Sequence, residues 1–246
     1  MPISKNVEDT IISIARCDNI DWGAGIGKGD CEKIVAHQGI SPSDFKKEHQ
    51  LPEAFSGKID EAKYLLISSN PFFDPSETPF PKFAWKDEEI VSYFYNRMGN
   101  YPNKRYLNAC KNIISWIYPK ETIETKDIAM TEIVHCKSQG EEGVDRLTCK
   151  ACGDAYFTRV LNLFTGKCIV LCGCKLWNHI KSSEAAYNAL LDQESKGVKI
   201  VMSYHPTYHY GKDPEAAKKK RVDDSLKVND WKKACKPKTS RKKRSL

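Results

Sequence analysis

Short runs of apolar residues recur along the chain and are separated by segments with a different pattern. Four such runs cover 64–68, 128–134, 167–171 and 199–202. Because they stay largely apolar over successive positions, they indicate strands covered on both faces of a sheet. Elsewhere apolar residues recur at the three- and four-residue spacing of amphipathic helices, in 7–16, 87–98, 106–117, 154–164 and 176–191. Residues 218–235 can extend as a final charged helix.

The order of these elements predicts the fold class. Strands that alternate with helices are typical of parallel sheets, because each crossover helix carries the chain back along one face of the sheet. We therefore expect a three-layer α/β/α sandwich with a central four-stranded parallel sheet. We assign residues 1–211 to one α/β domain and residues 212–246 to a basic C-terminal helix and tail.

Size and composition agree with one globular domain. The 246 residues are enough for one hydrophobic core, and the hydrophobic fraction of 40% excludes a wholly disordered or fibrous chain. No apolar run approaches the roughly 20 residues that a membrane helix needs. Charged residues at Lys5, Glu8 and Asp9 interrupt any secretory signal. We expect a soluble, cytoplasmic monomer that has no contact with membranes.

The net charge of +7 is concentrated at the C-terminus. Residues 212–246 contain 14 Lys and Arg against 5 Asp and Glu, a net charge of +9, which leaves −2 for the rest. Such a segment can follow a phosphate backbone and release its counterions. It can equally be a solubilising or targeting tail, and the charge run alone leaves both interpretations open.

Polar side chains stand at the carboxyl ends of the predicted strands, where parallel sheets bind ligands. Ser69, Asn70 and Pro71 follow the first strand, Glu132 lies in the second, and His205 follows the fourth. The glycine-rich segment 23–29 lacks the spacing of a phosphate-binding loop and follows no apolar strand, so we interpret it as a turn.

The Asn70-Pro71 turn and the His205-Pro206-Thr207 turn resemble the two active-site motifs of the uracil-DNA glycosylase superfamily. The resemblance covers about residues 64–210 and implies a monofunctional DNA glycosylase. Such an enzyme flips a base out of DNA and hydrolyses its N-glycosidic bond. By this resemblance, the His205 imidazole donates a hydrogen bond to the base carbonyl as negative charge develops, and the Asn70 amide orients the water.

The resemblance also assigns aromatic residues. Phe80 is similar to the family's stacking platform for the flipped base, with Phe83 as the alternative. Ser69 and Phe73 are expected to line the pocket, and Tyr208 to wedge into the DNA. For each aromatic side chain, ordinary core packing is the competing interpretation.

Glu132 differs from the residue that the iron–sulfur members of this superfamily have at the corresponding position. Iron–sulfur members carry an Asn that reads the uracil edge, in a segment similar to Thr131–Cys136. An ionised carboxylate only accepts hydrogen bonds, so Glu132 favours an exocyclic amine such as cytosine N4 over uracil O4. This predicts a modified cytosine as the target base. Conventional uracil excision, or an ion pair between Glu132 and a lysine, is the alternative.

The ten cysteines raise the prospect of a metal site, because disulfides are rare inside cells. In iron–sulfur members of the superfamily, a cysteine after the second strand pairs with one at the next helix, which corresponds here to Cys136 and Cys152, with Cys149 as competitor. Cys17 and Cys31 supply the remaining pair. We expect a structural 4Fe–4S cluster, while spacing leaves zinc or no metal open.

Two other functions fit part of the pattern. A base-binding module of the same fold would recognise a modified base without hydrolysis. A metal-dependent nuclease would need a carboxylate cluster, of which only Asp74 and Glu132 stand at strand ends. No lysine follows a predicted strand directly, so we expect no lyase step. The task, DNA repair or defence against phage DNA, is left open.

Overall fold

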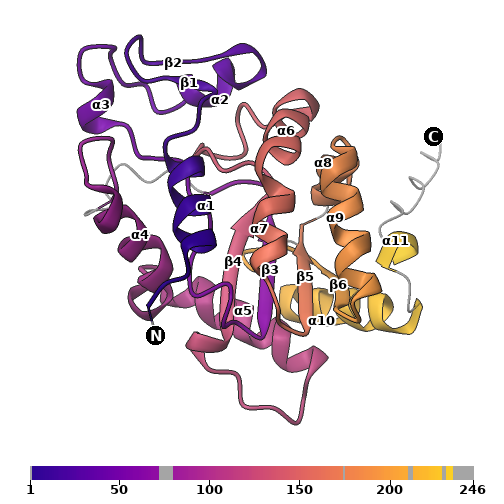
Figure 1. Ribbon diagram of the computed structural model, residues 1–246. Helices are drawn as coiled ribbons and strands as arrows, with labels where there is room; N and C mark the ends of the chain where they lie inside the picture. Colours follow the sequence, from indigo (N-terminus) through magenta and orange to yellow (C-terminus); the bar gives the residue numbers. More distant parts are fainter. Residues whose placement is uncertain (1, 72–79, 174, 210–212, 229–230, 235–246) are drawn as a thin grey trace, which may run out of the picture.

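The chain folds around a central parallel sheet (Figure 1). The computed structural model describes residues 2–71, 80–173, 175–209, 213–228 and 231–234. The four strands of the central sheet lie in the order β4-β3-β5-β6, and all neighbouring pairs are parallel. Their bounds are β3 (Tyr64–Ser68), β4 (Ile128–Glu132), β5 (Cys168–Cys172) and β6 (Lys199–Ser203). The predicted fold class, a three-layer α/β/α sandwich, is confirmed.

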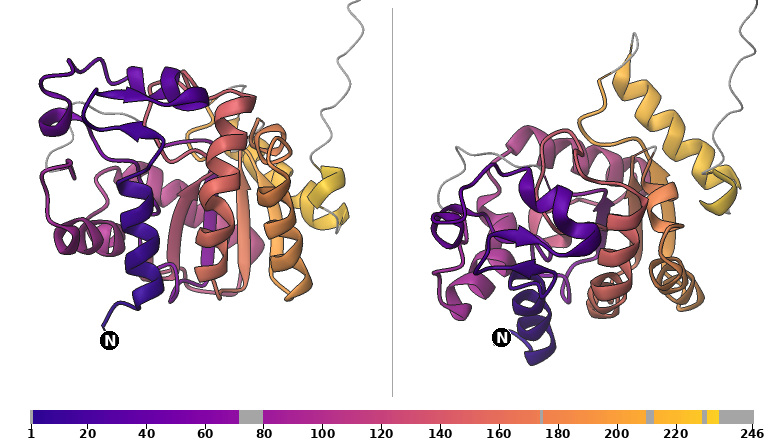
Figure 2. Two further views of the ribbon diagram at one scale, coloured as in Figure 1. Left: turned by 45° about the horizontal axis from the view of Figure 1, so that its top comes forward. Right: turned by 90° about the horizontal axis from the view of Figure 1, so that it is seen from above.

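The strands alternate their side chains between two hydrophobic cores. Leu65 and Ile67 face the larger core, and Tyr64 and Leu66 face the smaller one. The larger core is covered by α1 (Lys5–Ala15), α4 (Asp87–Asn96), α7 (Thr158–Leu163), α8 (Leu176–Ile180) and α9 (Glu184–Ser195). The smaller is covered by α5 (Lys104–Ile117) and α10 (Pro214–Val228), which lie on the opposite face of the sheet (Figure 2). Every residue of β3, β4 and β5 is buried, as their largely apolar pattern predicts.

Smaller elements gather beyond the carboxyl ends of the strands (Figure 1). The glycine-rich segment turns the chain from one two-residue strand into a second that pairs with it antiparallel, and three short helices lie near this pair. These elements are β1 (Ile20–Asp21), β2 (Ile26–Gly27), α2 (Glu32–Ala36), α3 (Phe45–Glu48) and α6 (Arg146–Cys152).

Two helices differ from the bounds that the hydrophobic pattern predicts. Ser183 accepts a hydrogen bond from the backbone N–H of Ala186 and begins α9, so the predicted helix 176–191 is two helices. The predicted helix 154–164 begins earlier than expected: Asp145 caps α6, and a π-helical turn, Gly153–Phe157, joins α6 to α7.

The C-terminal helix is part of the folded core. Lys218, Val222 and Ser225 of α10 are buried, and Ser225 Oγ accepts a hydrogen bond of 2.9 Å from the backbone N–H of Met202 in the edge strand β6. The short helix α11 (Trp231–Ala234) follows, and the Trp231 ring packs against Trp177 at 5.1 Å. Most of the basic tail, residues 235–246, lies outside the described residues. In the described ranges, none of the helices combines the length and apolarity needed to cross a membrane.

Candidate active site

Asn70 follows β3 and is held by the loop that follows β4. Its Nδ2 donates hydrogen bonds to the Pro71 carbonyl, at 3.0 Å, and to Ser138 Oγ, at 2.9 Å. Backbone bonds hold the two loops together, because Ile133 and Val134 donate to the carbonyls of Ser68 and Ser69. With both Nδ2 hydrogens used, Asn70 Oδ1 is the side-chain atom left to accept a hydrogen bond from water.

His205 follows β6 at the same edge of the sheet. Its Nδ1 lies 2.7 Å from Thr207 Oγ1 and accepts from the Thr207 backbone N–H, which favours the tautomer with the proton on Nε2. Burial and the charge of Lys218 lower the pKa of His205, although Glu141 opposes this shift. The imidazole is therefore neutral at pH 7 and has one N–H to donate.

Two neighbours fix the His205 turn. Lys218 is 2% exposed and donates a hydrogen bond of 3.0 Å from α10 to the Pro206 carbonyl. On the other side, the Tyr106 ring of α5 lies 5.7 Å from the imidazole. Both lie on the two helices that cover the smaller core, so the fold itself sets the position of His205.

Glu141 links the β3 and β6 ends electrostatically. It occupies the left-handed region with φ of 63°. Burial raises its pKa, but hydrogen bonds with Lys175 and Ser69 outweigh burial and lower it overall. The same carboxylate acts on the charge of His205. Ser69 and His205, two residues that the sequence assigns to one site, therefore lie within the range of one charged group.

Glu132 ends β4 beside Ser68 and is 9% exposed. Its Oε1 lies 3.4 Å from Ser68 Oγ, and its Oε2 is buried without a hydrogen-bond partner among the described residues. Burial, and then the nearby Glu53 charge, raise the pKa of Glu132 to about 8. The expectation that Glu132 is an ionised, acceptor-only carboxylate is therefore wrong at neutral pH, because a protonated carboxyl both donates and accepts.

A buried ion-pair network lies next to Glu132. The Glu53 carboxylate accepts from Arg97 at 2.6 Å and from Ser56 at 2.5 Å, and Lys137 Nζ lies 3.7 Å away. Burial raises the pKa of Glu53, but Arg97 and Lys137 outweigh it and lower the pKa overall. Glu53 therefore stays ionised while Glu132 holds its proton.

The aromatic candidates have different environments. Phe80 is 2% exposed, and Lys137 Nζ lies 3.6 Å above its ring, so the ring packs in the core beside the ion-pair network. Its alternative, Phe83, packs against Trp22 at 5.0 Å. Tyr208 is half-buried and stacks on Tyr204 at 4.4 Å. The roles assigned to these rings stay predictions.

Some predicted site residues fall outside the part of the chain that the structure describes. Phe73, which is expected to line the pocket, and Asp74, one of the two strand-end carboxylates of the nuclease alternative, belong to this group.

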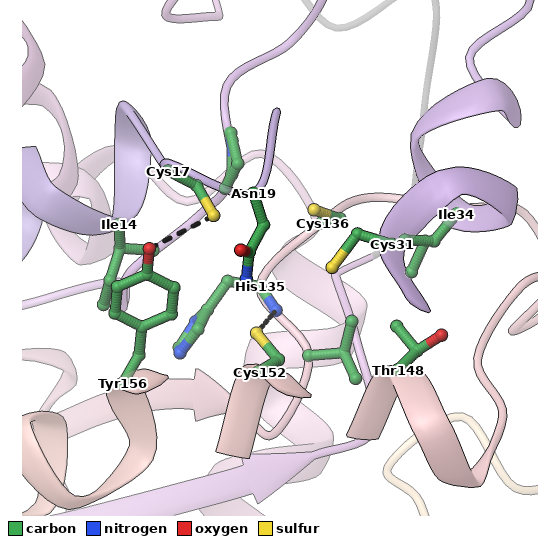
Figure 3. Close-up of a pocket in the computed structure, with 12 residues that line it drawn as sticks. Ile14, Cys17, Asn19, Cys31, Ile34, His135, Cys136, Thr148, Cys152 and Tyr156 are labelled. Atoms are coloured by element: carbon green, nitrogen blue, oxygen red, sulfur yellow. Dashed lines mark hydrogen bonds between the residues drawn. The ribbon is translucent and has the colours of Figure 1, made fainter. Parts of the chain in front are cut away.

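The four predicted cluster ligands line one cavity (Figure 3). Cys17 follows α1, Cys31 precedes α2, Cys136 follows β4, and Cys152 ends α6. Their sulfur atoms point into a shared space. The described lining residues include Cys152 but not Cys149, so Cys152 is the better placed of the two competitors.

These thiols are buried and close enough to affect one another. Burial is the largest cause of the raised pKa of each, and the charges of neighbouring cysteines add to it for Cys31, Cys136 and Cys152. Burial, with the Cys17 charge, raises the pKa of Cys31 to about 11. A metal centre relieves this repulsion because it binds the thiolate form. The donor set therefore fits a thiolate-bound cluster or zinc.

Two of the thiols also have hydrogen-bond donors that suit a thiolate. Tyr156 Oη donates to Cys17 Sγ at 3.1 Å, and the His135 backbone N–H donates to Cys152 Sγ at 3.4 Å. In the described part of the chain, no group of three or more His, Cys, Asp or Glu side chains already has the arrangement of a metal-ion site.

Comparison of the chain with known protein families and with curated proteins finds no significant match. The functional interpretation therefore depends on the geometry of the chain itself.

Sequence reasoning missed the supporting residues of the site. Glu53, Arg97 and Lys137 come from three distant segments, and only the fold brings them together. One local signal is available for Glu53, a single acidic residue within the otherwise apolar segment 51–55. Lys218 has no such signal, because it belongs to a run of lysines that reads as a solvated surface.

Proposed function

We propose that the protein is a monofunctional DNA glycosylase that hydrolyses the N-glycosidic bond of a flipped base. A modified cytosine remains the proposed target, because the protonated Glu132 carboxyl can donate to cytosine N3 and accept from its N4 amine. The observation that carries this proposal is the hydrogen-bonding state of Asn70 and His205 at one sheet edge. Asn70 has an acceptor left for water, and neutral His205 has a donor on Nε2.

These two groups meet the needs of the reaction. As the bond between the sugar and the base breaks, negative charge grows on the base and positive charge on the sugar. The His205 Nε2–H donates to the base carbonyl and stabilises the developing negative charge. Asn70 Oδ1 accepts from the water that adds to the sugar carbon. An amide is a weak base, so most of the rate depends on stabilisation of the departing base.

A structural cluster in the cysteine cavity is part of the same proposal. Cys17, Cys31, Cys136 and Cys152 would hold a 4Fe–4S cluster, with zinc as the alternative occupant. Bound there, it would join α1, the glycine-rich segment, α6 and the loop after β4. That loop also carries Ser138, the partner of Asn70, so the cluster would support the site without entering the chemistry.

The test is base release from defined DNA. Purified protein is incubated with single- and double-stranded oligonucleotides containing uracil, cytosine, or cytosines with substituents of increasing size at the 5-position. Released bases are identified by mass, and abasic sites by cleavage in alkali. We expect release of a cytosine-type base, and a loss of about 10²- to 10³-fold in kcat for His205→Ala, typical of one lost donor to a developing anion.

Matched controls separate the site from general damage. Asn162→Ala on the exposed side of α7 is the control for Asn70→Ala, and His37→Ala is the control for His205→Ala. Tight DNA binding without base release would identify a binding module, and strand cleavage before alkali treatment would indicate a nuclease. Either result would overturn the proposal.

A further inference from the structure

Among the described residues, one carboxyl oxygen of Glu132 has no hydrogen-bond partner. It ends β4 in register with Ser68, two residues before Asn70 in the neighbouring strand segment. The contact from Ser68 to Oε1 is long, at 3.4 Å, and Oε2 has no hydrogen-bond partner in the described ranges. A buried, unpaired polar atom is costly in a folded protein, and an incoming ligand that pairs with it removes the cost.

The charges around Glu132 hold the proton on its carboxyl group. Glu53, on the segment before β3, raises the pKa, while Arg97 and Lys137 lower it. Both cations are already bound to Glu53, at 2.6 Å and 3.7 Å. In the described part of the chain, the buried phenols of Tyr101 and Tyr106 also interact electrostatically with Glu132. Because both cations pair with Glu53, that carboxylate stays ionised and Glu132 keeps its proton.

Building on the proposed function, we infer that Glu132 is the general acid that protonates N3 of a cytosine-type base as the glycosidic bond breaks, and that Glu53 is its positioning residue. The proton leaves Oε2 for N3, and the electron pair of the bond between C1′ and N1 moves into the base. The base departs neutral. Water adds to C1′ and gives up one proton, which solvent returns to the Glu132 carboxylate.

This role separates cytosine from uracil on chemical grounds. Cytosine N3 carries a lone pair and can accept the proton, and its N4 amine can donate to the other oxygen of Glu132. Uracil N3 already carries a hydrogen, so Glu132 can hydrogen-bond to it but cannot protonate it there. Proton transfer to N3 therefore speeds the departure of cytosine-type bases, whereas for uracil the carboxyl supplies only a hydrogen bond, which Gln can replace.

The structure also gives the pH dependence. An acid with a pKa of about 8 is protonated at neutral pH and loses its proton as the pH rises. We expect kcat/KM on a cytosine-type base to fall as the pH increases through about 8. Removing the Glu53 charge, which raises this pKa, moves the fall to lower pH. A purely structural role for Glu53 would not shift the profile.

Glu132→Gln tests the inference, because Gln keeps one donor and one acceptor but cannot transfer a proton. We expect kcat on the cytosine-type base to fall by about 10²- to 10⁴-fold, the usual contribution of general acid catalysis. We expect little change in DNA affinity and less than about a threefold change in uracil release. Exposed Glu88→Gln is the matched control.

Glu53→Gln, followed as a pH–rate profile, tests the positioning residue. The double variant Glu53→Gln with Lys137→Met is a second test that removes one buried charge of each sign. We expect this double variant also to shift the pH–rate profile to lower pH, because Glu53 affects the pKa of Glu132 more strongly than Lys137 does.

Failure of this inference and failure of the proposed function give different results. If wild-type protein releases a cytosine-type base and Glu132→Gln releases it equally fast with an unchanged pH profile, the inference is wrong and the proposed function stands. If no base is released from any DNA, the proposed function is wrong and the inference falls with it.

Discussion

The stability of the protein should depend on pH through Glu132, and Glu132→Gln isolates this dependence. The side chain is 9% exposed, and its pKa rises from 4.5 to about 8 on folding. An acid whose pKa is raised by folding stabilises the native state most fully below the unfolded value, and that contribution is lost as the pH rises towards the folded value. Gln cannot ionise, so the variant avoids this loss.

The size of the effect follows from the two pKa values. Each pH unit between them corresponds to about 1.4 kcal/mol. The full interval therefore amounts to about 5 kcal/mol, of which about 4 kcal/mol falls between about pH 5 and about pH 8. Relative to wild type, Glu132→Gln should become more stable by about this amount across that range. The groups that titrate in both proteins largely cancel in the comparison.

Urea unfolding measures this difference directly. Free energies of unfolding are obtained for wild type and Glu132→Gln at several pH values, with Glu88→Gln as the exposed control. The difference between Glu132→Gln and wild type should grow steadily with pH, while that for Glu88→Gln should stay nearly constant. A Glu132→Gln difference that does not change with pH would show that Glu132 is not held protonated by the fold, and would refute its assignment as an acid.

Three further predictions concern other parts of the protein. Cys152→Ser should abolish the iron or zinc content measured by metal analysis and lower the melting temperature, whereas Cys149→Ser, on the same helix, should retain the metal; equal metal content in both would contradict the ligand assignment. Lys218→Met should lower kcat about tenfold with unchanged DNA affinity, because the Pro206 carbonyl loses its partner and the His205 turn loosens; an unchanged kcat would show that the turn is fixed without it. Deletion of residues 235–246, which contain six Lys and Arg, should weaken DNA binding and flatten the dependence of log Kd on log salt; an unchanged slope would assign the tail another role.

The sheet was predictable because its strands are buried on both faces. In a chain of this size, an uninterrupted apolar run has few alternatives to a buried strand. The bounds of β3 and β5 closely match the predicted ranges. The helix boundaries were less predictable. A single cap at Ser183 divides a continuous apolar pattern into two helices, and such local hydrogen bonds override periodicity.

The candidate site was predictable where the residues follow strands. Asn70 and His205 follow β3 and β6, and parallel strands bring their carboxyl ends to one edge. The protonation state of Glu132 was not predictable, because it depends on Glu53, a residue 79 positions away in sequence whose carboxylate already binds two cations. Charge networks of this kind are properties of the packed interior and leave almost no local pattern.

The most direct test is the single-turnover release of free base from DNA that carries a 5-substituted cytosine. The released base is measured by mass for wild type, His205→Ala and Asn70→Ala. The proposed function requires that wild type liberate the intact base, leave an abasic site and leave the strand uncut, and that both variants be slower by at least about tenfold. Absence of base release by wild type, or equal rates for all three proteins, would contradict it.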